Sequence, residues 1–267
     1  MARTTIDLST RDGICKTSLF RPDSGSGPWP GVLFFMDGVG PREALFEMAE
    51  RIAQRGYVVA LPDLFYRVGT YEPRKLWRLM FDPVTRKQWE TRFYDSAMDV
   101  EHFMIDAEAV LDFLETEPDV ADCRVGATGY GMGGTLALRA AGTFPECIGA
   151  AASFHGGELA SDDAESPHHL APRMKAQIYV AGAIDDPTFP FRMKQRLETA
   201  LRHAEVNHMI ETYACAKNGW TIPDHPAFDA PLAERHWRAL FALFDGALGP
   251  PMTTTKTSPS ARQHAAR

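Results

Sequence analysis

The sequence of 267 residues predicts one α/β domain with a mostly parallel sheet and helices on both of its faces. Two observations lead to this fold class. Short apolar runs alternate along the chain with amphipathic segments of helical length, which is the pattern of strands joined by crossover helices. A glycine-rich turn at residues 129–133 also follows one of these strands and opens the next helix. We place the domain at residues 1–249.

The first elements follow from their apolar spacing. Residues 32–36 form an apolar run typical of a buried strand, and residues 43–55 repeat apolar side chains at helical spacing before Gly56 ends the helix. A second buried strand is predicted at 57–61. Residues 62–94 are rich in proline, aromatic and charged residues, so we interpret them as an insertion that can shape a pocket.

The remaining segments continue the alternation of strands and helices. Beyond Leu248 the chain offers almost nothing to bury, so residues 250–267 are predicted to be a disordered tail. The elements expected before it are a helix at 98–114, a strand at 124–128, a helix at 132–144, strands at 148–154 and 177–181, a helix at 191–203, a strand at 206–213 and a helix at 232–244.

Composition narrows the function classes. A net charge of -7 without a basic stripe argues against a nucleic-acid partner. No run approaches the roughly 20 apolar residues of a membrane span, and four scattered cysteines favour a reduced cytoplasm. Neither these cysteines nor His168-His169 with Asp162 and Asp163 match a metal-ligand spacing, so we expect no metal and no cofactor. Cys215 is interpreted as a buried, inert thiol.

A nucleophile elbow without a nucleophile is the most informative motif. Gly129-Tyr130-Gly131-Met132-Gly133 follows a strand and opens a helix, and Gly131 occupies the central position where a reactive side chain is expected. The backbone amide of Met132 would then face an oxyanion at the helix N-terminus. The alternative is an ordinary glycine-rich turn or a phosphate cradle, because short glycine patterns are weak signals.

Several further stretches, in this order, give the chain a clear resemblance over roughly residues 10 to 248. It resembles the dienelactone hydrolase family, which implies an α/β-hydrolase fold and a triad of nucleophile, acid and base in that chain order. The stretches that carry the resemblance are Phe35-Met36-Asp37-Gly38, the run from Gly56 to Tyr66, the elbow with Met132-Gly133-Gly134, Ser153-Phe154-His155-Gly156-Gly157, and Glu234-Arg235-His236-Trp237.

The resemblance assigns the other two triad positions. Asp186 matches the acid, with Asp185 as the alternative, although an aspartate here can also serve as a helix cap. Asn218 stands where the family has the histidine base. Asparagine has no basic nitrogen near neutral pH, so it can hold a ligand but cannot move a proton. With Gly131 and Asn218 together, the chain lacks both the attacking atom and the proton shuttle of acyl transfer.

Other candidate residues surround these positions. Asp37 and Gly38 match the place where the family completes its oxyanion hole, and His155 follows a strand at the carboxyl edge, where it either lines the pocket or simply ends the strand. His225 is a candidate substitute base or an exposed loop histidine. Arg42, Arg67 and Arg74 can pair with a substrate carboxylate, but each is more often a solvated charge.

Three functions therefore remain open. The first, which the missing side chains favour, is a non-hydrolytic homologue that binds a small-molecule ligand such as an ester, lactone or carboxylate. The second is a hydrolase or other small-molecule enzyme with a non-standard site built from Asp186, His155 or His225. The third is a structural or partner-binding subunit. Fold alone does not choose among them, and the sequence does not give the oligomeric state.

Overall fold

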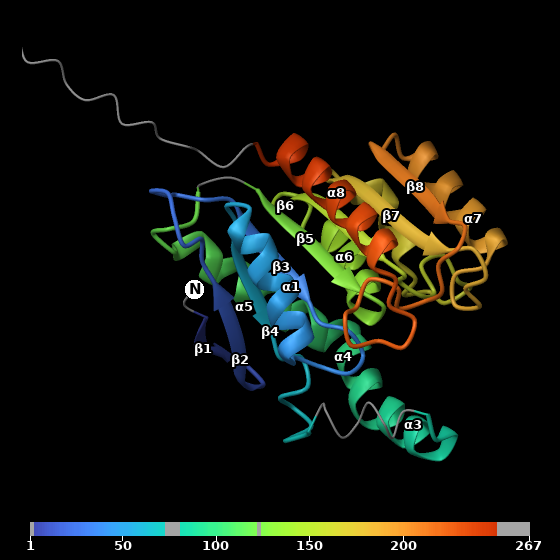
Figure 1. The fold of residues 1–267 in the computed structure, drawn as a ribbon, viewed down its shortest axis with the longest axis horizontal. Helices are drawn as coiled ribbons and strands as arrows, with labels where there is room; N and C mark the ends of the chain where they lie inside the picture. The colour runs from blue at the N-terminus through green and yellow to red at the C-terminus, as the bar shows by residue number, and fades with distance from the viewer. Residues whose placement is uncertain (1–2, 73–80, 122–123, 250–267) are drawn as a thin grey trace, which may run out of the picture.

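One twisted sheet organises the protein. The computed structural model describes residues 3–72, 81–121 and 124–249. Within them the strand order is β1-β2-β4-β3-β5-β6-β7-β8 (Figure 1); β2 is antiparallel to both of its neighbours, β1 and β4, and all the other neighbouring pairs are parallel. The strands are β1 (Thr4–Thr10), β2 (Gly13–Phe20), β3 (Gly31–Phe35), β4 (Val58–Pro62), β5 (Val125–Tyr130), β6 (Ile148–Phe154), β7 (Gln177–Ala183) and β8 (His208–Tyr213).

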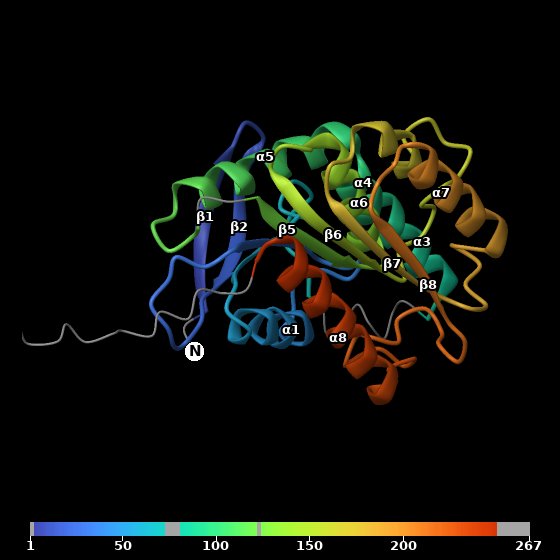
Figure 2. The same cartoon turned by 90° about the horizontal axis from the view of Figure 1, so that it is seen from above.

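Helices cover both faces of the sheet. Figure 2 shows α1 (Glu43–Gln54) and α8 (Ala230–Ala247) on one face, and α5 (Val100–Thr116), α6 (Met132–Thr143) and α7 (Phe191–His203) on the other. The central strands β3, β4, β5 and β6 are buried along their whole length. This burial explains why they are continuous apolar runs rather than alternating ones.

The sequence-based elements agree with the structure to within a few residues, apart from the N-terminal hairpin of β1 and β2. β1 alternates half-buried with exposed residues, and β2 alternates buried with exposed or half-buried residues before its last two, which are both buried. The signal was the alternation of Ile6, Leu8 and the residues between them, which is weaker than a continuous apolar run. The fold class, an α/β-hydrolase fold with a mostly parallel sheet, is confirmed.

The insertion carries helices of its own and packs on the edge of the sheet. They are α3 (Pro83–Trp89), a π-helical turn at Glu90–Tyr94 and α4 (Asp95–Met98). Trp89 and Phe93 stack on each other and each meets Phe65 edge to face, and the indole of Trp89 donates to the carbonyl of Gly38 at 2.7 Å. The insertion is therefore tied to the end of β3. Phe81, in contrast, is exposed.

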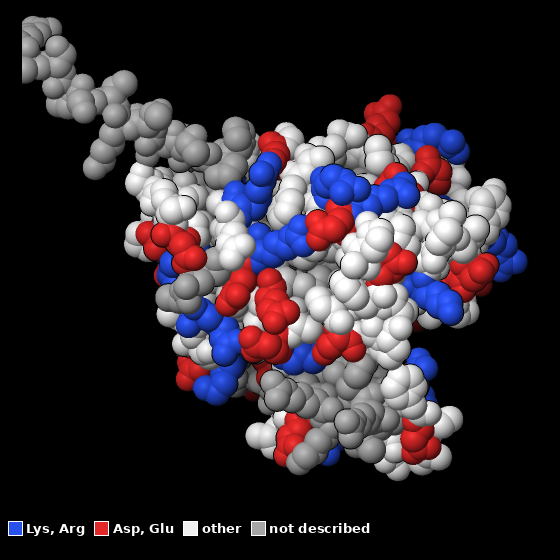
Figure 3. Space-filling model, in the orientation of Figure 1, with Lys and Arg blue, Asp and Glu red and all other residues white. Residues whose placement is uncertain are grey.

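Some of the sequence-based expectations fall on residues that the structure does not describe. The tail predicted at 250–267 lies outside the described residues, as does Arg74 in the insertion. Within the described ranges, no helix is long and apolar enough to cross a membrane. On the face shown in Figure 3, acidic and basic side chains lie interspersed.

Candidate functional site

The turn between β5 and α6 has the strained geometry of a nucleophile elbow. Gly131 has φ 56° and ψ -117°, a conformation that side chains rarely adopt, and it is the N-cap residue of α6. Among the described residues other than its chain neighbours, only His155 would come within 4 Å of a Cβ atom built on Gly131, with its Nδ1 at 3.9 Å. The elbow backbone is thus present, with open space where a reactive side chain would stand.

The first turn of α6 lies directly against the end of β3. A Cβ on Gly133 would come within 2.3 Å of the carbonyl oxygen of Phe35 and 2.5 Å of that of Met36, so only glycine permits this approach. The amide of Met132 in this turn and that of Gly38 after β3 have no acceptor among the residues that the structure describes. These two N–H groups are the donors available to a ligand oxygen at the elbow.

His155 joins the two sides of the site. The backbone N–H of Gly131 is shared between the carbonyl oxygen of Phe154 at 3.0 Å and the Nδ1 of His155 at 3.1 Å, so Nδ1 is the unprotonated ring nitrogen and Nε2 donates to the hydroxyl of Thr221 at 2.8 Å. The backbone of His155 has a positive φ of 41°, and its carbonyl accepts from Asn218. Burial lowers the pKa of His155 to about 3, which keeps the imidazole neutral.

The acid and base positions face each other as the resemblance implies. Asp186 is buried, and its Oδ1 accepts the backbone N–H and the hydroxyl of Thr188 at 2.9 and 2.7 Å. Its Oδ2 accepts the amide Nδ2 of Asn218 at 2.8 Å. Asp185 is exposed and makes none of these contacts. The geometry therefore favours Asp186 over Asp185 as the residue that matches the acid.

Asp37 belongs to a buried ion-pair network. The guanidinium of Arg42 is bound in a bidentate manner by Asp37, at 2.8 and 2.9 Å, and by Asp224, at 2.7 and 2.9 Å. Arg42 is only 6 % exposed, so the interpretation of Arg42 as a solvated charge is wrong. The reason is tertiary, because Asp224 comes from a loop far away in the sequence. Arg67 is likewise ion-paired rather than solvated, through Asp106 and Asp12.

His225 lies close to the site but is held by its own loop. Its Nδ1 accepts the backbone N–H of Ala227 at 2.9 Å, and its ring packs against Gly219, where a Cβ would come within 2.4 Å of it. Burial lowers the pKa of His225. The ring thus packs against Gly219 with its Nδ1 already accepting a hydrogen bond, which does not favour the role of a substitute base.

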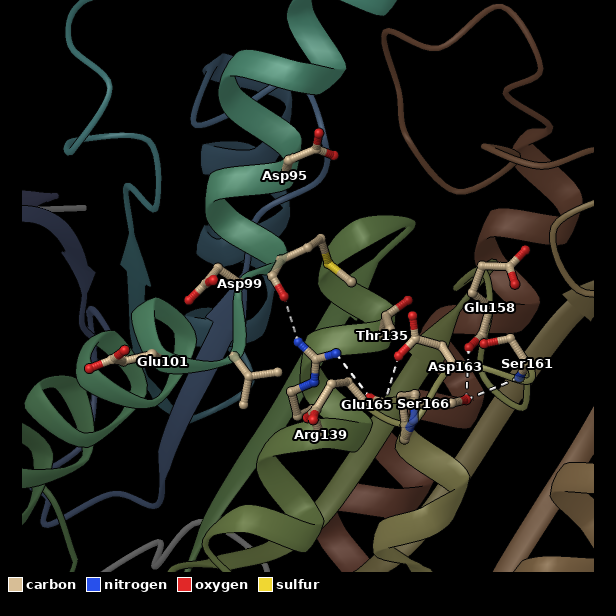
Figure 4. A pocket seen from close by; sticks show the side chains of 13 residues that line it. Asp95, Asp99, Glu101, Thr135, Arg139, Glu158, Ser161, Asp163, Glu165 and Ser166 are labelled. Carbon is tan, nitrogen blue, oxygen red and sulfur yellow. Dashed lines mark hydrogen bonds between the residues drawn. The ribbon is translucent and has the colours of Figure 1, made fainter.

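A large acidic cavity begins one helical turn beyond the elbow. Thr135 lines it, and the cavity of ≈ 740 Å³ lies between α4, the start of α5, α6 and the loop after β6 (Figure 4). The buried guanidinium of Arg139 donates there to two backbone carbonyls, those of Met98 and Glu165. Six carboxylates also line the cavity, from Asp95, Asp99, Glu101, Glu158, Asp163 and Glu165.

Metal-binding and thiol chemistry find little support in the geometry. No group of three or more His, Cys, Asp or Glu residues suited to a metal ion occurs in the described part of the chain. His168 hydrogen-bonds to Ser166, and Asp162 forms an ion pair with Arg196 of α7, so both side chains already have protein partners. The expectation of a buried Cys215 is wrong, because its residue is exposed.

The fold and this edge of the sheet define an α/β-hydrolase. A sequence profile of the dienelactone hydrolase family matches residues 15–248, and the chain belongs to that family. A putative carboxymethylenebutenolidase of Synechocystis sp. is 25 % identical over 226 residues, which cover 82 % of this chain and 86 % of that one. A putative dienelactone hydrolase from Klebsiella pneumoniae superposes with a TM-score of 0.79 at 20 % identity, covering 91 % of this chain and 98 % of that one. A dienelactone hydrolase-like promiscuous phosphotriesterase from metagenomic libraries reaches a TM-score of 0.74 at 25 % identity, with coverage of 92 % and 99 %.

Sequence reasoning missed three residues that shape the site. Thr188 follows Asp186 by two positions, and this short spacing is typical of a local turn in which an aspartate accepts from the backbone. That signal was available. Thr221 and Asp224, in contrast, acquire their partners His155 and Arg42 only through the fold, and no local pattern indicates these pairs.

Proposed function

We propose that this protein binds a small uncharged or weakly polar carbonyl compound non-covalently at the elbow and does not form an acyl-enzyme. The observation that carries this proposal is the intact elbow backbone around Gly131, with open space in place of a nucleophilic side chain. Backbone donors at Met132 and Gly38 remain in position for a carbonyl oxygen. The chain therefore has backbone donors for a carbonyl oxygen but no side-chain atom at residue 131 that could attack the carbonyl carbon.

The base position supports the same conclusion. Asn218 takes the place of a proton shuttle but uses its amide to bridge Asp186 and the carbonyl of His155. Both ring nitrogens of His155 are already engaged in hydrogen bonds, and a pKa near 3 makes it a poor base. The alternative of an enzyme that uses Asp186, His155 or His225 as a substitute base is therefore less well supported.

Chemical labelling tests the absence of covalent catalysis. The protein is incubated with p-nitrophenyl acetate and with small lactones, and intact-mass and peptide mass spectrometry are then recorded. We expect no stoichiometric acyl adduct on the peptide that contains Gly131, because glycine supplies no attacking atom. A rapid burst with a stoichiometric adduct on any residue of the site would contradict the proposal, whereas slow labelling of surface lysines would not.

Binding at the elbow has its own test. Titration with small lactones and lactams should shift the backbone amide resonance of Met132. Gly131→Leu fills the open space and should suppress that shift, at a cost in stability of about 1–3 kcal/mol for the positive φ. Gly249→Leu is the matched control, since Gly249 also has a positive φ and open space but lies at the end of the described chain. Equal binding by wild type and a folded Gly131→Leu variant would place the ligand elsewhere.

A further inference from the structure

The amide of Asn218 has one defined orientation. Its Nδ2 donates to the Oδ2 of Asp186 at 2.8 Å and to the carbonyl oxygen of His155 at 3.3 Å, so both of its N–H groups are used. The flipped amide would set Oδ1 against two oxygen atoms that can only accept. Two acceptors therefore fix Nδ2, and Oδ1 has no donor from any side chain or backbone group that the structure describes.

The site consequently offers one acceptor together with two donors. The donors are the N–H group of Met132, in the first turn of α6, and that of Gly38, after the end of β3 against which this turn packs. Asn218 and Gly131 both contact His155, one through its carbonyl and the other through its ring, so the acceptor and the elbow lie on either side of a single residue. A matching ligand presents an acceptor oxygen next to a donor hydrogen.

We propose that Asn218 makes the site selective for small uncharged carboxamides, including lactams, whose carbonyl oxygen accepts from Met132 and Gly38 while their N–H donates to the Oδ1 of Asn218. This inference rests on the proposed function, because it names the ligand class of the same site. An ester or lactone has the carbonyl but no donor. Its ether oxygen would face Oδ1 and leave that acceptor without a partner.

Charge works against the remaining ligand class, the carboxylates. A carboxylate presents only acceptor oxygens, so one of them would face the Oδ1 of Asn218 and the nearby carboxylate of Asp186. The neighbouring cavity is also strongly acidic, with six carboxylates against the single guanidinium of Arg139 (Figure 4). The negative potential of such a wall disfavours an anion that approaches from this side.

Three ligands of the same ring or chain size separate these classes. 2-Piperidone is the lactam, δ-valerolactone the lactone and valerate the carboxylate, and each is titrated while the amide resonance of Met132 is followed. We expect 2-piperidone to bind roughly three- to tenfold more tightly than δ-valerolactone, the value of one hydrogen bond. Valerate should bind more weakly than either. This ranking in the wild-type protein needs no variant.

Substitution of the acceptor tests the assignment to Asn218. Asn218→Leu keeps a similar side-chain volume but removes Oδ1, along with the Nδ2 that donates to Asp186 and His155, so the preference for lactam over lactone should fall to about one. Asn207→Leu is the matched control, because Asn207 is exposed and its side chain makes no contact with the site. It should leave the preference unchanged. Thermal melting and the dispersion of the amide spectrum check that both variants are folded.

The outcomes distinguish this inference from the proposed function. Equal binding of lactam and lactone, tighter binding of valerate, or a preference that survives in folded Asn218→Leu would overturn the selectivity while leaving ligand binding at the elbow intact. Failure of all three ligands to shift Met132, up to high millimolar concentration, would contradict both proposals. Hydrolysis of δ-valerolactone that requires Asn218 would contradict the proposed function itself.

Discussion

The imidazole of His155 accepts the backbone N–H of Gly131 at 3.1 Å, and this contact joins the vacant elbow to the rest of the site. The same residue holds Thr221 with its Nε2 and Asn218 with its carbonyl. His155 therefore contacts three neighbours of the site through its ring and its carbonyl. Its neutral form is required, because Nδ1 can accept from Gly131 only while it is unprotonated.

Restoring the two missing side chains should restore chemistry. Gly131→Cys with Asn218→His is expected to hydrolyse small activated esters or lactones measurably, whereas each single variant does so only weakly. Open space at Gly131 and the preformed pairing of Asp186 with residue 218 leave both new groups in position. The effects should be strongly non-additive, because a thiol without a base is only partly thiolate and a histidine without a nucleophile has nothing to activate.

The check on this double variant is burst kinetics after thermal melting has shown a folded protein. The positive φ of residue 131 adds about 1–3 kcal/mol of strain for any side chain. A folded double variant with neither a burst nor turnover would mean that the pocket itself is remodelled. That result would favour a function other than one derived from ester or lactone hydrolysis.

Replacement of the acid separates Asp186 from Asp185. Asp186→Asn is expected to lower the free energy of unfolding by about 1–3 kcal/mol, because its new NH₂ group must face either Thr188 or the Nδ2 of Asn218, both of which donate. Asp185→Asn should change it by no more than about 0.5 kcal/mol, since Asp185 is exposed. Urea denaturation measures both, and equal effects would refute the assignment.

The Arg42 network gives a prediction about stability. Arg42→Met is expected to cost about 3–5 kcal/mol, because it leaves the carboxylate of Asp37 buried without its partner. Arg86→Met, which removes the exposed pair with Glu90, should cost no more than about 1 kcal/mol. Chemical denaturation of the two variants side by side is the measurement. A small loss for Arg42→Met would show that Asp37 reaches solvent or another donor.

Stability should fall as the solution becomes acidic. Burial lowers the pKa of His155 and of His236 to about 3, below the ordinary value of 6.5. Above pH 6.5 the two histidines are neutral in both the folded and the unfolded protein, so they add no pH dependence to the free energy of unfolding there. As the pH drops from 6.5 toward 3, the unfolded chain binds protons that the folded protein does not, and each histidine removes about 1.4 kcal/mol per pH unit.

A single variant isolates one of these histidines. His155→Gln keeps a donor and an acceptor but cannot titrate, so its free energy of unfolding should decrease less steeply between pH 6 and pH 4 than that of the wild type. Urea denaturation at several pH values gives the slopes. Identical slopes for the two proteins would show that His155 takes up a proton in the folded state.

Much of this protein is determined by the sequence alone, because the relevant signals are local. Buried strands such as β3 and β5 are continuous apolar runs, and the elbow is readable because its glycines and the following helix lie within a few residues. The absence of a side chain at Gly131 is likewise visible without any structure. The exposed alternation of β1 made that strand harder to predict.

The tertiary structure alone decided how the site residues are used. Asp224 neutralises Arg42 across 182 positions of sequence, and Thr221 accepts from the Nε2 of His155 across 66. The orientation of the Asn218 amide also depends on two acceptors from other loops. Hydrogen bonds and ion pairs of this kind depend on distances of about 3 Å, which only the packing of distant segments sets, and no residue pattern encodes them.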